Sequence, residues 1–241
     1  MTIGEMHYDF KQKLNKLDSQ KNRNLKVPEI DWKLNEAIEM FVKIVAQPRL
    51  ANQFGVETSQ RTIDDIRTIV VDQKKDDGVV PTVYDESSYI AKLPDDYWFY
   101  LNSNIYIKKG TCEVKVNKVR EVQHDDENEN SPFNKSSFLW REVNIRFNND
   151  GIRIFTDGVF EITKVCFDYL KQPKRVWNAA AWIGGTYKLL DGTVLSGTQD
   201  CDLPVRVHRE IVDLGVTITA LDLGQPDYSF KKDKLAIDQL T

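Results

Sequence analysis

The last part of the chain contains a segment whose hydrophobic residues follow the period of an α-helix. Between Leu203 and Leu223, spacings of four, three, four and three residues place one continuous apolar stripe on a helix face: Val207, Ile211, Leu214, Ile218 and Leu221. A second apolar stripe lies beside it and consists of Val205, Val212, Val216 and Leu223. Pro204 suits the first turn of a helix and indicates where this one begins. The pattern predicts a C-terminal helix that must be covered on two sides.

The second stripe could be covered by other helices of this chain or by a neighbouring copy. Gly215 lies in mid-helix, where glycine costs about 1 kcal/mol relative to alanine, so we expect another backbone to approach closely there. An earlier helix, predicted over Asp31–Gln47 with Asp31 as its N-cap, also has more apolar surface than one contact needs, at Trp32 and Ile38. Because two helices share this excess, we predict an oligomer interface formed by Trp32, Ile38, Val205, Val212, Val216 and Leu223.

The N-terminal region is predicted to be helical. Ile3–Leu17 is amphipathic, with Phe10, Leu14 and Leu17 on one side, and a short helix is expected around Ile63–Arg67.

Residues 69–170 change to a pattern typical of strands. Short β-branched and aromatic groups are separated by Asp, Gly and Pro, and apolar residues alternate with polar ones from Val143 to Phe147. Asp157-Gly158 is a turn signal, and Pro173 is expected to end the last strand. Many short strands at this spacing favour a small antiparallel sandwich or barrel. Further on, Asp191-Gly192 predicts a β-hairpin.

These elements predict an α+β fold. N-terminal helices and a long C-terminal helix pack together, with an antiparallel β-sandwich or barrel module between them. We expect four segments: an N-terminal helical region (1–68), a β module (69–173), a tryptophan-rich run with a β-hairpin (174–202), and the C-terminal helix and tail (203–241).

Composition and charge indicate a soluble globular protein. Apolar residues make up 41% and charged residues 29% of the 241 residues, and no run approaches the roughly 18 apolar residues that a membrane span needs. The formal net charge of −4 argues against binding nucleic acid through its phosphates, but suits a wall past which nucleic acid slides. The N-terminus lacks an apolar signal core. Cys112, Cys166 and Cys201 show no CxxC spacing, so free thiols and synthesis in a cytoplasm are expected.

No catalytic motif is evident in the sequence. Neither GxxxxGK[ST] nor GxSxG occurs, and Gly184-Gly185 is interpreted as the entry to a hairpin. With only His7, His124 and His208 available, a Ser/His or Cys/His pair has few candidates. We expect no enzymatic activity and no cofactor.

Metal and nucleic-acid sites are also not expected. His208 precedes Glu210 without a second histidine one turn on, so it is predicted to be a helix-surface or interface residue rather than a zinc ligand. The acidic segment His124–Asn134 lacks the spacing of a calcium loop. The aromatic run Tyr97–Tyr100 could stack bases, but it lacks interleaved basic residues until Lys108, so a core or subunit contact is favoured.

Four stretches, taken together and in order, resemble one family. They are EMHYDFKQKLNKLDSQKNRNLKVPEIDWKLNEA, LPDDYWFYLNS, VFEITKVCFDYLKQP and DLPVRVHREIVDLGV, and they look like the tail-ring and neck proteins in virions of crAss-like phages. The resemblance implies a non-enzymatic virion protein, made in the host cytoplasm, that forms homo-oligomeric rings in a short tail barrel beneath the portal. Partners would be the portal or neighbouring ring proteins, with DNA only as passing cargo and no membrane. Docking on a portal would make the ring about twelvefold.

Two other functions stay open from the residues alone. A monomer could bind a ligand or nucleic acid through the aromatic run, and an enzyme would need a pocket that joins His124 or His208 to a carboxylate.

Overall fold

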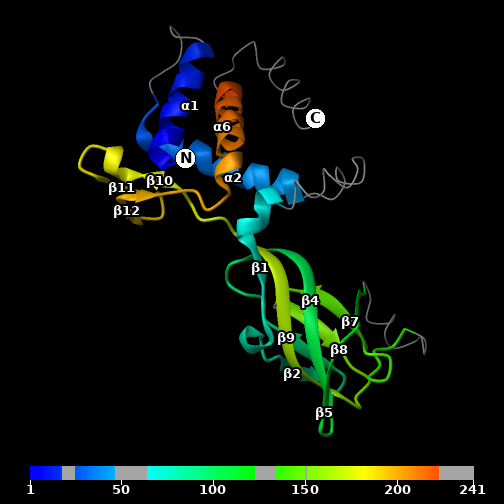
Figure 1. Ribbon diagram of the computed structural model, residues 1–241. Coiled ribbons are helices and arrows are strands. Elements are labelled where there is room, and N and C mark those ends of the chain that lie inside the picture. Colours follow the sequence, from blue (N-terminus) through cyan, green and yellow to red (C-terminus); the bar gives the residue numbers. More distant parts are fainter. Residues whose placement is uncertain (18–24, 47–63, 123–133, 150, 223–241) are drawn as a thin grey trace, which may run out of the picture. The chain divides into compact units, whose positions relative to one another are not determined.

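The computed structural model describes residues 1–17, 25–46, 64–122, 134–149 and 151–222 (Figure 1). The chain forms two compact units. A helical unit combines Met1–Ile69 with Pro173–Thr241, and a β module comprises Val70–Gln172. The fold is therefore α+β, as the sequence predicts. Three of the four predicted segments, 1–68, 174–202 and 203–241, fall within the helical unit.

The two N-terminal helices begin at residues that cap them. Before α1 (Ile3–Leu17), the hydroxyl of Thr2 accepts a hydrogen bond from the Glu5 amide at 3.3 Å, and the Glu5 carboxylate accepts one from the Thr2 amide at 2.9 Å. This reciprocal pair is a capping box. At α2 (Val27–Ala46), the Glu29 carboxylate accepts from the Lys26 amide at 2.7 Å. The prediction that Asp31 caps this helix is wrong, because α2 begins one turn earlier and Asp31 lies inside it.

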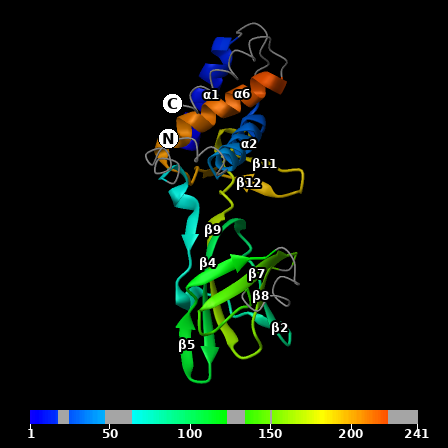
Figure 2. The ribbon, with the colours of Figure 1, turned by 90° about the vertical axis from the view of Figure 1, so that its right-hand side faces the viewer.

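The C-terminal helix lies between the two N-terminal ones. Helix α6 (His208–Asp222) follows a 3₁₀ turn, η4 (Val205–Val207), and Figure 2 shows α6 between α1 and α2. A Cβ atom added at Gly215 would lie 3.3 Å from Phe10 of α1 and 3.5 Å from Ala37 of α2. The predicted packing of the N-terminal helices with the C-terminal helix is confirmed. The two apolar sides of α6 have a simple explanation, because each side covers one helix of the same protomer.

The β module contains two sheets. The first has the order β1-β9-β4-β5, and the second has the order β2-β3-β8-β7-β6. The strands of the first sheet are β1 (Val70–Asp72), β9 (Glu161–Lys171), β4 (Tyr97–Lys109) and β5 (Cys112–Lys115). Those of the second are β2 (Thr82–Asp85), β3 (Ser88–Ala91), β8 (Gly151–Phe155), β7 (Glu142–Asn148) and β6 (Lys118–Glu121).

The two sheets share one apolar core. It is built mainly from the inward residues of the long strands and includes Ile105, Ile107, Ile145, Ile154, Val165 and Phe167. Most strand pairs are antiparallel, as predicted, and the sheets form a half-barrel. One pair differs, since β6 runs parallel to β7. Parallel strands need a long connection, and the chain between Glu121 and Glu142 provides it.

The segment between the β module and α6 belongs to the helical unit. Strand β10 (Trp177–Asn178) pairs with β13 (Thr198–Gln199), and a 3₁₀ turn, η3 (Ala179–Ala181), follows β10. Strands β11 (Thr186–Lys188) and β12 (Val194–Ser196) form the hairpin that Asp191-Gly192 predicts, with Gly192 at a φ of 87°. We call residues 182–196 the ribbon.

Candidate functional site

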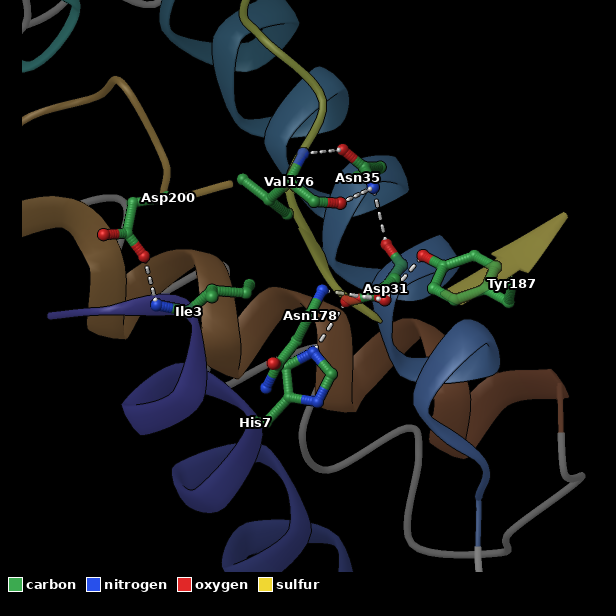
Figure 3. A network of polar contacts seen from close by, with 8 residues as sticks. All are labelled: Ile3, His7, Asp31, Asn35, Val176, Asn178, Tyr187 and Asp200. Atoms are coloured by element: carbon green, nitrogen blue, oxygen red, sulfur yellow. Dashed lines mark hydrogen bonds and ion pairs between the residues drawn. The ribbon is translucent and has the colours of Figure 1, made fainter. Parts of the chain in front are cut away.

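A buried carboxylate, that of Asp31, joins four segments of the helical unit (Figure 3). One oxygen, Oδ1, lies 2.7 Å from Nε2 of His7 on α1. The other, Oδ2, accepts hydrogen bonds from the Asn178 amide at 3.1 Å and from the Tyr187 hydroxyl at 2.7 Å. Asp31 itself is on α2, so its side chain links both N-terminal helices to β10 and β11. A buried charge is tolerated when it is paired and hydrogen-bonded in this way.

Asn35, one turn further along α2, adds a second link to the same strand region. Its side chain donates to the Val176 carbonyl at 2.8 Å and accepts from the Val176 amide at 2.8 Å. The Asn35 amide also donates to the backbone carbonyl of Asp31 at 2.7 Å. At the start of α1, the Ile3 amide donates to the Asp200 carboxylate at 2.7 Å (Figure 3). These bonds fix the base of the ribbon to both helices.

The Asp31 network is built to hold segments together. A His–Asp pair can also orient a catalytic base, but such a base must reach its substrate, and His7 is only 5% exposed. Burial, together with the hydrogen bond to Asp31, raises the pKa of the Tyr187 hydroxyl well above its usual value. The hydroxyl therefore stays protonated and remains a donor. We interpret the network as a structural clamp.

Three of the predicted interface residues are buried inside the protomer. Val212 and Val216 lie on α6 where it contacts α1 and α2, and Ile38 lies on the inner side of α2. The structure corrects the expectation that these side chains are left for a neighbour. The reason is the position of α6 between two helices, which buries the central residues of both apolar stripes within one chain.

The other predicted interface residues have different positions. Trp32 on α2 is 61% exposed and Val205 in η4 is 67% exposed, so both are accessible to a partner. Gly215 lies at the narrow contact of α6 with α1 and α2 described above. Leu223 lies outside the described residues.

The ribbon carries exposed apolar residues that the sequence pattern did not single out. Leu190 is 99% exposed, Ile183 is 90% exposed, and Val194 is also exposed. Each of the first two lies in a tight turn, next to the glycines that make the turn possible. The sequence contains the turn signals Gly184-Gly185 and Asp191-Gly192, but no pattern in it marks the apolar residues beside them as contact points.

A comparison with known families decides what kind of protein this is. The sequence model of a family described as phage tail ring protein 3/4, from the crAss-like phages, matches residues 1–227. The chain belongs to this family. No curated relative matches the sequence. The resemblance to crAss-like tail-ring proteins is therefore confirmed, and a virion structural role follows for this tail ring protein.

The two histidines of the tail ring protein that the structure describes, His7 and His208, are buried and hydrogen-bonded. His208, predicted at a surface or interface, is instead buried, with Nε2 at 2.8 Å from the Leu203 carbonyl and Nδ1 at 3.0 Å from the Met1 carbonyl. It thus ties the chain start to the turn before α6. His124 and the rest of its acidic segment up to residue 133 lie outside the described residues.

The described part of the tail ring protein contains few features of a chemical site. Within it, no three His, Cys, Asp or Glu side chains gather closely enough to hold a metal ion. Cys112, Cys166 and Cys201 are free thiols, and burial raises the pKa of Cys201 to about 11. Among the same residues, no helix combines the length and hydropathy that crossing a membrane would require.

Proposed function

We propose that the protein is a structural subunit that assembles with copies of itself into a ring of the phage tail. The ring would surround the channel through which the genome and its cargo pass. The observation that carries this proposal is the family match, which spans residues 1–227 of the chain. A structural rather than enzymatic role agrees with the Asp31 clamp, whose polar groups are satisfied by one another.

The arrangement of exposed residues supports ring formation. Neighbours in a ring meet head to tail, so each copy must offer two different surfaces. The helical unit offers exposed apolar residues both on the ribbon, at Ile183 and Leu190, and on α2, at Trp32. If the ring docks on a portal, about twelvefold symmetry is expected.

The β module supports a second kind of contact, with the portal or with neighbouring rings. A turn at Phe138–Arg141 presents Leu139 and Trp140 to solvent. Phe138 packs against the core of the module, and the Arg141 amide donates to the Phe138 carbonyl at 3.3 Å, so the turn is anchored. Exposed large apolar residues on an anchored turn are typical of a contact with another protein.

The net charge of the chain fits a passive channel wall. A formal charge of −4 gives little attraction for phosphates, so DNA would pass without being held. The protein would be made in the host cytoplasm, consistent with its free thiols, and would act in the virion.

Native mass spectrometry and negative-stain imaging of the purified chain test the proposal. The expected result is a closed ring of one copy number, either alone or after mixing with the portal and neighbouring ring proteins. Monomers alone under all of these conditions would contradict it. Measuring DNA binding by fluorescence anisotropy tests the other function, a monomeric nucleic-acid-binding module, which predicts an affinity that falls steeply with salt.

A further inference from the structure

We infer that the ribbon of one copy docks on the outward stripe of α2 in the next copy of the ring. This inference rests on the proposed function and specifies its contact. We define the outward stripe by the α2 residues that face solvent: Glu29, Trp32, Glu36, Met40 and Lys43.

The two turns of the ribbon present apolar side chains to solvent from a hydrogen-bonded backbone. At Ile183, the Gly185 amide donates to the Trp182 carbonyl at 2.9 Å, and Gly184 has a φ of 87°. At Leu190, the Gly192 amide donates to the Leu189 carbonyl at 3.0 Å. The second turn is closed further by the Thr193 amide, which donates to the Asp191 carboxylate at 2.8 Å. Because these turns are hydrogen-bonded, little backbone entropy remains to be lost when they are covered.

The two faces of the ribbon differ. Tyr187 and Leu195 are cross-strand partners on the face that is turned toward the clamp, and the Tyr187 hydroxyl reaches Asp31. Lys188 and Val194 are partners on the opposite face, and both are exposed. The sheet has only these two strands among the described residues, and two strands alone are marginally stable in water. Burial of the outer face against another surface would therefore stabilise the ribbon.

The outward stripe of α2 is a suitable acceptor. Its members are spaced by three, four, four and three residues, so they form one line along the helix. Trp32 is 61% exposed and Met40 is 44% exposed, which places two large apolar side chains in a line that is otherwise charged. Tryptophan and methionine are both enriched in protein interfaces.

Charge disfavours a contact between two α2 helices. The ribbon contains one basic side chain, Lys188, and one acidic side chain, Asp191, so its net charge is zero. The outward stripe contains Glu29, Glu36 and Lys43, which gives a net charge of −1. A neutral ribbon meets this stripe without net repulsion, whereas two such stripes carry like charge.

The positions of the two surfaces favour a second copy as the occupant. In Figure 1 the ribbon lies on one side of α1 and α6, and the C-terminal half of α2, which carries Met40 and Lys43 of the outward stripe, extends to the other side. A surface and its complement on opposite sides of one unit produce a head-to-tail contact, which closes into a ring when the rotation permits. An isologous dimer would need one surface that is complementary to itself.

The test compares the wild-type chain with Ile183→Asp/Leu190→Asp and with Leu139→Asp as the matched control on the β module. Because all three side chains are exposed, each variant should fold, which circular dichroism checks. Native mass spectrometry across a dilution series should show that the ribbon variant needs at least about tenfold more protein to assemble. The control should assemble as the wild type does.

Cysteine pairs test which surface the ribbon meets. In a chain with Cys112→Ser, we expect mild oxidation to link copies when Leu190→Cys is combined with Trp32→Cys or with Met40→Cys. No link is expected when Leu190→Cys is combined with Leu139→Cys.

Each remaining outcome overturns a different statement. Rings that persist unchanged in the ribbon variant, or rings lost equally in the control, overturn the ribbon contact and leave the proposed function intact. Rings that depend on the ribbon but give no α2 link overturn the assignment of α2 as the acceptor. A wild-type chain that never assembles overturns the proposed function itself.

Discussion

The helical unit and the β module are held together in different ways. The helical unit joins segments that are far apart in the chain, and the Asp31 carboxylate alone contacts residues 24, 147 and 156 positions away. The β module is continuous from Val70 to Gln172, and its strands are joined by backbone ladders, of which the pair β4 and β9 is the longest.

This difference determines where each unit is vulnerable. A side-chain clamp fails when one particular side chain is removed, because its buried partners lose their hydrogen bonds. Strands that are joined by backbone hydrogen bonds tolerate most side-chain substitutions. They are destabilised where an added atom would clash with the backbone of a neighbouring strand.

Asp31→Ala should destabilise the helical unit by about 3–5 kcal/mol, because it leaves the buried His7 and Asn178 and the half-buried Tyr187 without their hydrogen-bond partner. Hydrogen exchange measured by mass spectrometry in increasing urea can report on each unit separately. The β module should be unaffected, and Met40→Ala at an exposed position of α2 serves as the control. Equal loss of protection in both units would contradict the proposed separation.

Gly151→Ala should destabilise the β module by about 2–4 kcal/mol. Gly151 has a φ of 139°, and a Cβ atom there would lie 2.2 Å from the Ala91 carbonyl oxygen in the neighbouring strand. The matched control is Gly110→Ala, at a φ of 60° with nothing within 4 Å of the added atom, which should cost only about 1 kcal/mol. The same exchange experiment measures both, and equal costs would show that the close approach is unimportant.

Val212→Ala and Val205→Ala compare a buried and an exposed residue of the second apolar stripe. Val212 is buried under α1 and α2, so its truncation should cost about 2 kcal/mol by urea denaturation. Val205 is exposed, and its truncation should change the free energy of unfolding by less than about 0.5 kcal/mol. Similar costs at both positions would mean that Val205 is covered in the isolated chain.

The stability of the β module should fall slightly as the pH rises from about 4 to about 6. Burial, and then the hydrogen bond and charge of Asp72 on the paired strand, raise the pKa of the Asp168 carboxyl from 3.8 to about 6. The folded module therefore holds a proton that the unfolded chain releases, and its stabilising effect is lost as the pH passes through this window. After solvent screening is allowed for, the expected loss is about 1 kcal/mol.

Calorimetric unfolding at several pH values measures this effect as the difference between the wild type and Asp168→Asn. The variant should lack the slope, because it cannot titrate. Asp95→Asn, at an exposed position, should keep it. A wild-type slope of the opposite sign would show that the two carboxylates do not repel each other in the folded module.

Local patterns in the sequence were sufficient to predict most of the elements. The helix at Ile3–Leu17 is observed with the predicted bounds, and the Asp191-Gly192 hairpin is present. The predicted start of α2 is four residues late, although Pro28 and Glu29 in its first turn are both helix-start signals. Aspartate is a common N-cap residue, which favours a cap at Asp31, but the role of Asp31 depends on His7 and Tyr187, which lie far away in the chain.

The interface could not be predicted from periodicity alone. An apolar stripe shows that a side must be covered but does not show by what. Most of the described residues in both stripes are buried within the protomer, whereas Val205 and Leu221 are exposed. The ribbon has no period that would draw attention to Ile183 and Leu190. Their exposure follows from two tight turns whose orientation is fixed by the clamp, which is a long-range contact.

The division of the helical unit into two separate stretches of chain also affects how the protein is made. During synthesis, α1 and α2 emerge first and cannot bury the apolar sides that α6 covers until the β module has been translated. The continuous β module has all of its strands before then. A nascent chain at this stage would have a complete β module, while the apolar sides of α1 and α2 would still be exposed. Completion of α6 and the ribbon that precedes it would coincide, so a chain could not offer its ribbon to a neighbour much before its own core had closed.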